Sequence, residues 1–354
     1  MKTNIGKQTV ALALLALLSF GCGSGPRDHI NLVWYPNESG EDKRETRIEL
    51  ERIIAEATGR EVRSTLTTDY TVAIEAIVNA AADIAFMGAQ GYVEARRKNP
   101  AIKPLVTHTG PSGTLADAVY YSWMAVRSED ADLYRAEDGE FSLDKLEGRS
   151  FAFVSVNSTS GTKIPAAVIA EHFRTRPGQA ELGASDLIQR GGAGILQQVL
   201  FSGTHIGGMM NLLMDKADVV ALASSQLLAQ MELVEGELNK AGSRYLIRTD
   251  AKEPLKRFGG RSVTLIHSSP VLNEPFAVNS DTIPPEQVAA IQAALTSEAV
   301  SSNPIIFTPA DGGRKGIFKK RGDERFIIVE DDWYNPIREL TMGDSEGLLP
   351  DRHQ

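Results

Sequence analysis

The chain has 354 residues, 42% of them hydrophobic, and its 37 Lys and Arg against 46 Asp and Glu give a formal net charge of -9 at pH 7. A chain of this size can build two domains, each with its own hydrophobic core. The acidic balance without a basic stripe argues against a nucleic-acid partner, because phosphate backbones are bound by clustered Lys and Arg. Any anion site in this protein must therefore be formed by a few neighbouring residues and not by an extended basic surface.

The N-terminus has the pattern of an export signal. Lys2 and Lys7, with no acidic residue near them, precede an apolar run from Val10 to Phe20. The run covers about 11 residues, whereas a helix that crosses a bilayer needs roughly 20. We expect residues 1–22 to form a lipoprotein signal peptide with its anchor residue, and residues 23–28 to form a tether.

Cys22 is the only cysteine of the chain and directly follows Gly21. Residues 18–22, Leu-Ser-Phe-Gly-Cys, resemble a bacterial lipobox, and an unpaired cysteine in an oxidising compartment is usually consumed. The sequence predicts that a lipid on Cys22 anchors the protein to a membrane, in the periplasm or cell envelope. Phe20 is larger than the usual residue at its position, which leaves an ordinary signal-peptidase cut or an uncleaved anchor as alternatives.

Strands and helices alternate along the first part of the mature chain. Strands are predicted over 29–35, 62–66 and 83–87, and helices over 43–58 and 71–81. Such alternation favours a mostly parallel sheet covered by helices.

A long strand without a helical partner, 119–126, indicates a crossover into a second lobe. The lobe beyond it has predicted strands over 151–156 and 218–223 and predicted helices over 162–173 and 194–201, and a strand over 275–278 and a helix over 284–298 return to the first lobe. The sequence thus predicts an α/β protein with residues 29–122 plus 271–354 in lobe 1 and residues 123–270 in lobe 2.

The two halves share a quasi-repeat. Tyr70 precedes Asp83 by the same interval as His205 precedes Asp218, and each pair spans a predicted helix. If the lobes are alike and face one another, both helix starts point into the crevice between them, where open α/β sheets bind ligands. A chance similarity of two amphipathic helices is the alternative.

A turn rich in hydroxyl groups follows the strand 151–156. Its residues are Asn157-Ser158-Thr159-Ser160-Gly161, and a predicted helix begins directly after it. A helix start offers unpaired N–H groups and a partial positive charge, which suit an oxyanion. A single cap would need one hydroxyl, not three in succession.

This turn resembles that of the phosphonate and phosphite family of transporter binding proteins, which are PhnD-like. Further segments resemble family landmarks in the same order: Thr68-Asp69-Tyr70, Asp83 to Gly88, Tyr121-Ser122, Gly203-Thr204-His205, Ala217-Asp218-Val219 and Pro270 to Phe276. The resemblance implies a type II periplasmic-binding-protein fold with a ligand cleft between two lobes. It also implies an ABC transporter permease in the inner membrane as partner, and a small phosphorus oxyanion captured by hinge closure.

The resemblance assigns the phosphorus oxygens to Ser158, Thr159 and Ser160, and it places Tyr70 and His205 over the ligand. Tyr121, in one of the matching segments, and Gln90, beside the changed Met87, complete the predicted ligand-binding set.

Two departures from the family pattern bear on the ligand. Ala223 stands where an acid is expected near an ammonium group, and a buried ammonium without a carboxylate is costly. Met87 replaces an aromatic residue. An aminoalkylphosphonate is therefore disfavoured, whereas phosphite, phosphate, a small alkylphosphonate or a non-phosphorus anion stay open.

The same residues are compatible with other functions. Ser160 and His205 could form a nucleophile and base of a phosphate-ester hydrolase, but the chain has neither a Gly-x-Ser-x-Gly elbow nor a P-loop. A sensor that presents its closed form to a histidine kinase is a further alternative. The remaining histidines show no metal spacing, so no metal, no cofactor and no catalytic residue are expected. A monomer is expected.

Overall fold

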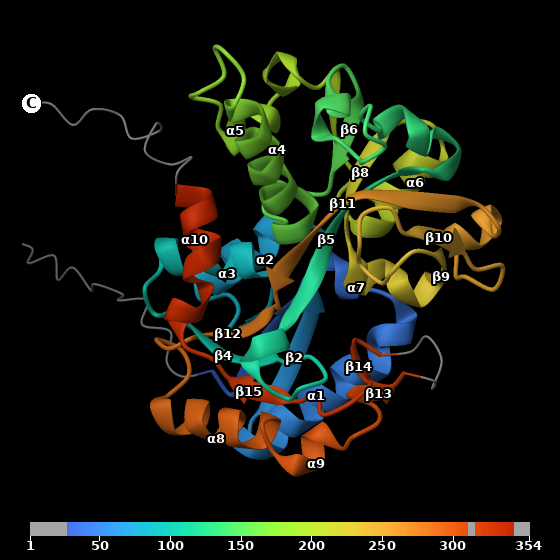
Figure 1. Cartoon of the computed structure of the whole chain (residues 1–354). Helices are drawn as coiled ribbons and strands as arrows, with labels where there is room; N and C mark the ends of the chain where they lie inside the picture. Colours follow the sequence, from blue (N-terminus) through green and yellow to red (C-terminus); the bar gives the residue numbers. More distant parts are fainter. Residues whose placement is uncertain (1–26, 311–315, 343–354) are drawn as a thin grey trace, which may run out of the picture.

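The computed structural model describes residues 27–310 and 316–342. The predicted signal peptide, Cys22 and most of the tether lie outside the described residues. Two sheets dominate the fold, one of six and one of seven strands (Figure 1). Within the described ranges, no helix combines the length and the apolar character needed to cross a membrane.

The six-stranded sheet forms lobe 1, in the strand order β15-β4-β12-β3-β1-β2. β1 pairs in parallel with β2 and β3, and β12 joins antiparallel to β3 and β4. Its strands are β1 (His29–Trp34), β2 (Glu61–Leu66), β3 (Ile84–Phe86), β4 (Ile102–His108), β12 (Pro275–Asn279) and β15 (Phe326–Ile328).

Helices cover both faces of this sheet (Figure 1). α1 (Arg44–Thr58) and α8 (Pro285–Leu295) pack on one face, in a core that includes Trp34 and Phe276. α2 (Tyr70–Val78) and α3 (Ala89–Lys98) pack on the other face. Side chains alternate between the two faces of a strand, so neighbouring residues of β1 enter different cores.

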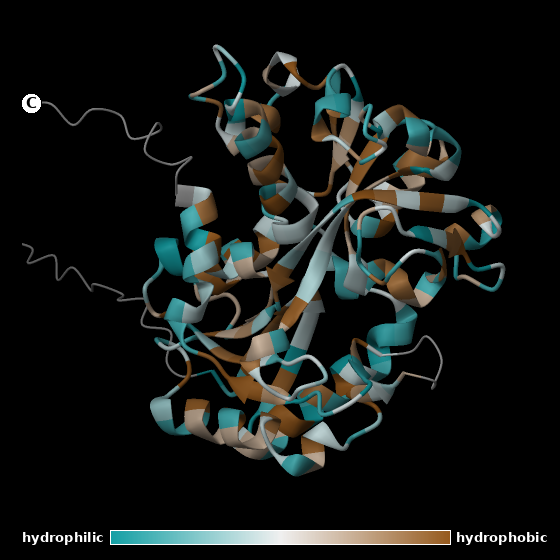
Figure 2. Ribbon diagram, viewed as in Figure 1, coloured by the Kyte–Doolittle hydropathy of each residue, from teal (hydrophilic) through white to brown (hydrophobic). Residues whose placement is uncertain are grey.

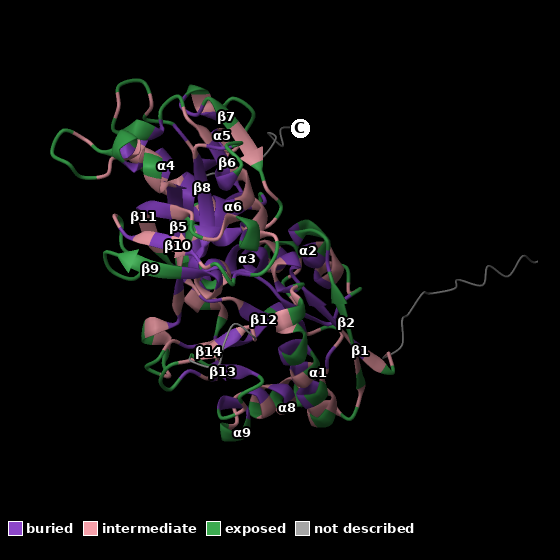
Figure 3. Cartoon of the chain, turned by 90° about the vertical axis from the view of Figure 1, so that its right-hand side faces the viewer, coloured by how far each residue is buried: buried purple, intermediate pink, exposed green. Residues whose placement is uncertain are grey.

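The seven-stranded sheet forms lobe 2, in the order β7-β6-β8-β5-β11-β10-β9. Its strands are β5 (Val119–Arg127), β6 (Ser150–Phe153), β7 (Gln198–Phe201), β8 (Val219–Ala223), β9 (Met231–Glu235), β10 (Arg244–Ile247) and β11 (Ser262–Leu272). α4 (Ile164–Arg174) and α6 (His205–Leu213) lie on opposite faces, each with its own core. Figure 2 shows apolar residues concentrated in the strands, and Figure 3 shows most of these strands buried.

Shorter elements complete the chain. They are α5 (Ala184–Leu187), α7 (Ser224–Leu227), α9 (Glu298–Ser301), α10 (Asn335–Met342), β13 (Phe307–Pro309) and β14 (Phe318–Lys320). α10 packs beside α3 on lobe 1 and also touches α4 of lobe 2 (Figure 1).

Two long strands connect the lobes. β5 carries the chain into lobe 2 and β11 carries it back, and the two pair antiparallel from Val119 opposite Leu272 to Arg127 opposite Val263. They run side by side through the middle of the molecule (Figure 1). A pair of strands that joins two lobes in this way can flex as a hinge.

The quasi-repeat of the sequence corresponds to matched hydrogen bonds in the two lobes. Asp83 accepts from the backbone nitrogen of Asn31 at 2.7 Å, and Asp218 accepts from that of Ser150 at 2.9 Å. Asn31 lies in β1, between β2 and β3, and Ser150 lies in β6, between β7 and β8, so the two strands occupy equivalent places in their sheets. The two lobes therefore have the same local topology at these positions.

A second pair of bonds strengthens this equivalence. The Thr67 hydroxyl donates to the Trp34 carbonyl at 2.8 Å, and the Ser202 hydroxyl donates to the Phe153 carbonyl at 2.6 Å. Thr67 and Ser202 lie three residues before Tyr70 and His205 respectively. These bonds fix the loops that begin α2 and α6 against the ends of their sheets.

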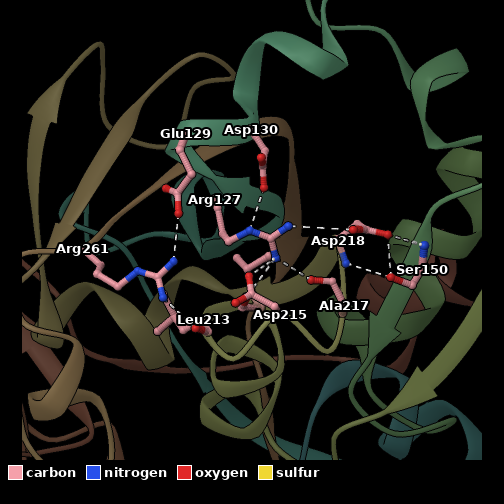
Figure 4. A network of polar contacts seen from close by, with 10 residues as sticks. Arg127, Glu129, Asp130, Ser150, Leu213, Asp215, Ala217, Asp218 and Arg261 are labelled. Carbon is pink, nitrogen blue, oxygen red and sulfur yellow. Dashed lines mark hydrogen bonds and ion pairs between the residues drawn. The ribbon is translucent and has the colours of Figure 1, made fainter.

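A polar network fixes the far end of α6 (Figure 4). Arg127, at the end of β5, donates to the carbonyls of Leu212 and Ala217, each at 3.1 Å, and forms an ion pair with Asp130 at 2.7 Å. Asp218 lies beside the same guanidinium at 3.8 Å. The helix that begins at His205 is thereby attached to the crossover strand.

One predicted helix is absent. Residues 194–201 were expected to be helical, but Gln198–Phe201 form β7, which pairs in parallel with β6. Gly191, Gly192, Ala193 and Gly194, which lead into this stretch, all have positive φ angles, and the residues after them extend to pair with Ser150–Phe153. The apolar residues after this run pack on β6 instead.

Candidate functional site

A cavity lies between the lobes, at the ends of β1, β3 and β6. Lobe 1 and the return segment contribute Tyr35, Asn37, Glu38, Tyr70, Phe86, Met87, Gly88 and Glu274, and lobe 2 with its crossover strand contributes Tyr120, Ser158, Thr159, Ser160, His205, Ala223 and Gln226. Its volume is about 20 Å³, room for about one water molecule. The lobes are thus closed tightly around it.

The hydroxyl turn forms one wall of the cavity. Residues Thr159–Lys163 form a π-helical turn that leads into α4, and the Ser158 hydroxyl caps it by accepting from the Gly161 nitrogen at 3.1 Å. A side chain at position 161 would collide with Val154, so glycine is required there. π-helical turns are rare and frequently mark functional sites.

Tyrosines surround these hydroxyl groups. Tyr70 is 2% exposed, its hydroxyl oxygen accepts a hydrogen bond from Asn37 Nδ2, and Ser158 of the other lobe lines the same cavity. Tyr120 lines the same cavity beside Ser160 and Thr159. Burial raises the pKa of both tyrosines, so their hydroxyl groups stay protonated and can donate.

His205 supplies a further neutral donor. The ring is 3% exposed, and its Nδ1 atom accepts from the Ala223 nitrogen at 3.0 Å. Burial, with a smaller effect of Lys43, lowers the pKa of His205 to about 3. The ring is therefore neutral at physiological pH with its proton on Nε2, and can donate a hydrogen bond from that atom.

The predicted site residues fall into two groups. Tyr70, Ser158, Thr159, Ser160 and His205 line one cavity. Gln90 approaches it through its backbone, whose nitrogen donates to Thr159, and its buried Oε1 atom has no hydrogen-bond partner in the described structure.

Tyr121 does not line the cavity, whereas its neighbour Tyr120 does. Tyr121 packs with the α6 side of the lobe 2 core. Successive side chains of a strand point to opposite faces, so an error of one position in β5 exchanges the two tyrosines.

Several residues that line the cavity were not predicted from the sequence. Tyr35, Asn37 and Glu38 follow β1, just as the hydroxyl turn follows β6. The quasi-repeat could have predicted their position, because the equivalent strands β1 and β6 end at the same edge of equivalent lobes. Glu274 lies within a segment that matched the family pattern, yet nothing in the pattern indicated that its side chain faces the ligand cleft.

Glu38 takes part in a clasp between the lobes, formed by Glu38, Lys43 and Gln226. Lys43 lies 3.1 Å from the Glu38 carboxylate and donates to Gln226 Oε1 at 2.6 Å, while Gln226 Nε2 donates to Glu38 at 3.0 Å. Gln226 belongs to lobe 2 and the other two to lobe 1. This clasp closes one side of the cavity.

The carboxylates of Glu38 and Glu274 also change the argument drawn from Ala223. Acidic side chains do reach the cavity, from positions 38 and 274 rather than 223. The lack of an acid at position 223 is therefore no sufficient reason to exclude a ligand with an ammonium group. Within residues 27–310 and 316–342, no three His, Cys, Asp or Glu side chains are grouped closely enough to hold a metal ion.

The sequence matches a known protein family over most of its length. A model of the periplasmic substrate-binding proteins of phosphonate ABC transporters matches residues 32–334. The chain belongs to this family. Members are substrate-binding components of ABC transporters and are periplasmic, so the protein is a transport component with a small ligand and a membrane permease as partner.

Solved structures share the fold. A binding-protein component of an ABC phosphonate transporter from Pseudomonas aeruginosa is 16% identical, with a TM-score of 0.60 over 89% of this chain and 86% of that one. PhnD1 from Prochlorococcus marinus, solved with methylphosphonate, is 14% identical, with a TM-score of 0.60 over 90% and 99%. XAC2383 from Xanthomonas citri, solved with ATP, is 15% identical, with a TM-score of 0.57 over 90% and 98%. No curated protein matches the sequence.

These comparisons confirm the predicted α/β fold of two lobes and the predicted membership of the PhnD-like family.

Proposed function

We propose that this periplasmic binding protein captures a small phosphorus oxyanion by closing its lobes, and that Ser158, Thr159, Ser160, Tyr70, Tyr120 and His205 bind it. The observation that carries the proposal is the convergence of hydroxyl groups and a neutral imidazole on one cavity at a helix start. Each of these groups can donate a hydrogen bond to an oxyanion without a full positive charge beside it.

Hinge closure follows from where the donors lie. Ser158, Thr159 and Ser160 come from lobe 2, whereas Tyr70 comes from lobe 1. An oxyanion can be contacted by both sets only when the lobes are closed, so the ligand stabilises the closed state. The permease then receives a closed, loaded protein.

The same geometry argues against hydrolysis. His205 would have to accept the Ser160 proton, but its Nδ1 atom already accepts from Ala223. Its pKa of about 3 makes the ring a very weak base at neutral pH. The Ser160 and His205 pair therefore supplies binding groups and not a nucleophile with its general base.

Isothermal titration tests the proposal. Purified protein freed of bound ligand by unfolding and refolding should bind at least one of phosphite, methylphosphonate and phosphate. Ser160→Ala should weaken binding about ten- to hundredfold, the equivalent of about 1.5 to 3 kcal/mol for a hydrogen bond to a charged group. Ser128→Ala is the matched control, because its hydroxyl contacts Thr264 at 2.9 Å outside the cavity. Equal affinity of Ser160→Ala and wild type would contradict the site.

We also propose that Cys22 carries the lipid that attaches the protein to the membrane. Cys22→Ser should release the protein from the membrane fraction into the soluble fraction. Retention of this variant in membranes would show that another segment anchors the chain.

A further inference from the structure

The cavity contains more negative charge than an oxyanion site should. Among the described residues that line it, the ionisable acidic side chains are Glu38 and Glu274, and no Lys or Arg is present. A carboxylate repels an anion at this range, especially where water is excluded. Glu38 has Lys43 at 3.1 Å to compensate its charge, but Glu274 needs another explanation.

The backbone holds Glu274 at the cavity. The residue lies between β11 and β12, where the chain returns to lobe 1. The nitrogen of Asn273 donates to the Ala118 carbonyl at 3.0 Å, and the Thr107 hydroxyl donates to the Glu274 carbonyl at 3.0 Å. Among the described side chains, none donates a hydrogen bond to the Glu274 carboxyl group, which accepts from its own backbone nitrogen.

The groups that face this carboxyl group come from several elements. Glu38 and Lys43 face it from the segments after β1, Tyr70 from α2, Tyr120 from β5, Tyr334 from the segment before α10, and His205 from α6. Burial raises the pKa of the three tyrosines, and His205 is neutral. Glu38 and Lys43 bear opposite charges and are paired with each other.

Burial and, to a smaller extent, the charge of Glu38 raise the pKa of Glu274 to about 7, while the hydrogen bond from its own backbone nitrogen and the charge of Lys43 act in the opposite direction. This carboxyl group can therefore carry a proton near neutral pH, and it then becomes a hydrogen-bond donor instead of a repelling charge. An oxyanion that enters the cavity can accept a hydrogen bond from this protonated carboxyl group.

We propose that Glu274 is a specificity-determining residue that shares one proton with the bound oxyanion, which makes capture proton-linked and favours anions with basic oxygens. No covalent bond changes: the proton lies between a Glu274 carboxyl oxygen and one ligand oxygen. Phosphonate, phosphite and phosphate oxygens are basic enough to hold such a proton, whereas those of sulfate are far less basic. The inference rests on the proposed function, because it assumes that an oxyanion binds in this cavity.

Calorimetry of purified protein with methylphosphonate tests this. Titrations at pH 8.5 in two buffers with different ionisation enthalpies give the number of protons taken up per ligand. At this pH Glu274 is largely ionised before binding, so wild type should take up close to one proton, and its affinity should fall about tenfold per pH unit above pH 8. Glu274→Asp should keep the uptake, whereas Glu274→Gln should lose it and show a flatter pH dependence.

Glu38→Gln is the matched variant, because it removes the other carboxylate of the cavity. It should keep the proton uptake. Wild-type binding without proton uptake, or uptake that survives in Glu274→Gln but disappears in Glu38→Gln, would overturn the assignment to Glu274. A preference for methylphosphonate over sulfate that is unchanged in Glu274→Gln would also contradict it.

The outcomes separate the two proposals. If wild type binds no oxyanion at all, the proposed function itself fails. If it binds methylphosphonate without taking up a proton, capture stands and the role of Glu274 fails. Loss of all binding in Glu274→Gln leaves the wild-type and Glu274→Asp measurements to decide.

Discussion

The Thr159 hydroxyl of lobe 2 accepts a hydrogen bond from the backbone nitrogen of Gln90 in lobe 1, at 3.0 Å. The bond connects the hydroxyl turn directly to the start of α3 in the opposite lobe. Thr159 can still donate its own proton into the cavity, so one side chain both closes the lobes and contacts the ligand.

Thr159→Val should therefore weaken ligand binding about tenfold or more. The substitution keeps the shape of the side chain but leaves the Gln90 nitrogen without a partner in the closed state, at a cost of about 1 to 3 kcal/mol. Isothermal titration measures the loss of affinity, and small-angle scattering should show a larger fraction of open protein.

Thr162→Val is a suitable control for that variant. Thr162 is fully buried in the same turn, and its hydroxyl has no hydrogen-bond partner in the described structure. Its replacement should leave affinity unchanged and the melting temperature equal or higher. If both variants lose affinity equally, the bond between Thr159 and Gln90 has no special role in closure.

The clasp of Glu38, Lys43 and Gln226 should slow ligand release. Gln226→Ala removes the two hydrogen bonds by which the clasp crosses between the lobes but leaves the ion pair within lobe 1. We expect dissociation to become about three- to thirtyfold faster, with little change in association, because interface contacts act mainly on the off-rate. Stopped-flow fluorescence measures both rates.

Lys252→Ala provides the comparison. Lys252 forms an ion pair across the lobes with Asp42 at 3.1 Å, and its side chain is 43% exposed. Exposed ion pairs contribute little, so the rates should change less than twofold. An effect as large as that of Gln226→Ala would show that any contact across the lobes slows release, without a particular role for the clasp.

Two histidines largely shielded from solvent should make the fold less stable in acid. Burial lowers the pKa of His108 to about 4, from about 6.5 in an unfolded chain. Between these two pKa values the unfolded state binds a proton that the native state does not bind. The free energy of unfolding therefore falls as the pH drops from about 6.5 towards 4. His205, with its pKa of about 3, adds to this loss.

Replacing His108 measures its contribution to the loss of stability in acid. His108→Phe keeps an aromatic ring against Phe318, whose centre lies 5.0 Å from the imidazole, and removes the titration. The melting temperature of this variant should decline less than that of wild type between pH 6.5 and 4.5. Parallel curves for the two proteins would contradict the assignment.

The parts of the site that depend on local sequence could be predicted. The hydroxyl turn and the starts of α2 and α6 were identified because caps, glycines and hydroxyl groups act within a few residues of one another. The matched bonds of Asp83 and Asp218 show that the quasi-repeat describes real equivalence between the lobes.

What could not be predicted depends on distant contacts or on strand register. Tyr120 replaces Tyr121 at the cavity because one position along β5 reverses the face. Glu274 reaches the cavity only because β11 returns to lobe 1 beside β5, a contact that no local pattern contains. The helix expected over 194–201 is missing because residues 198–201 pair with β6, a strand almost 50 residues earlier that no local pattern indicates.

A crystal structure of the protein grown with methylphosphonate tests the central claim most directly. The account predicts closed lobes with the phosphonate oxygens within hydrogen-bond distance of Ser158, Thr159, Ser160 and Tyr70. A phosphonate bound away from the hydroxyl turn, or bound to one lobe while the crevice stays open, would contradict it.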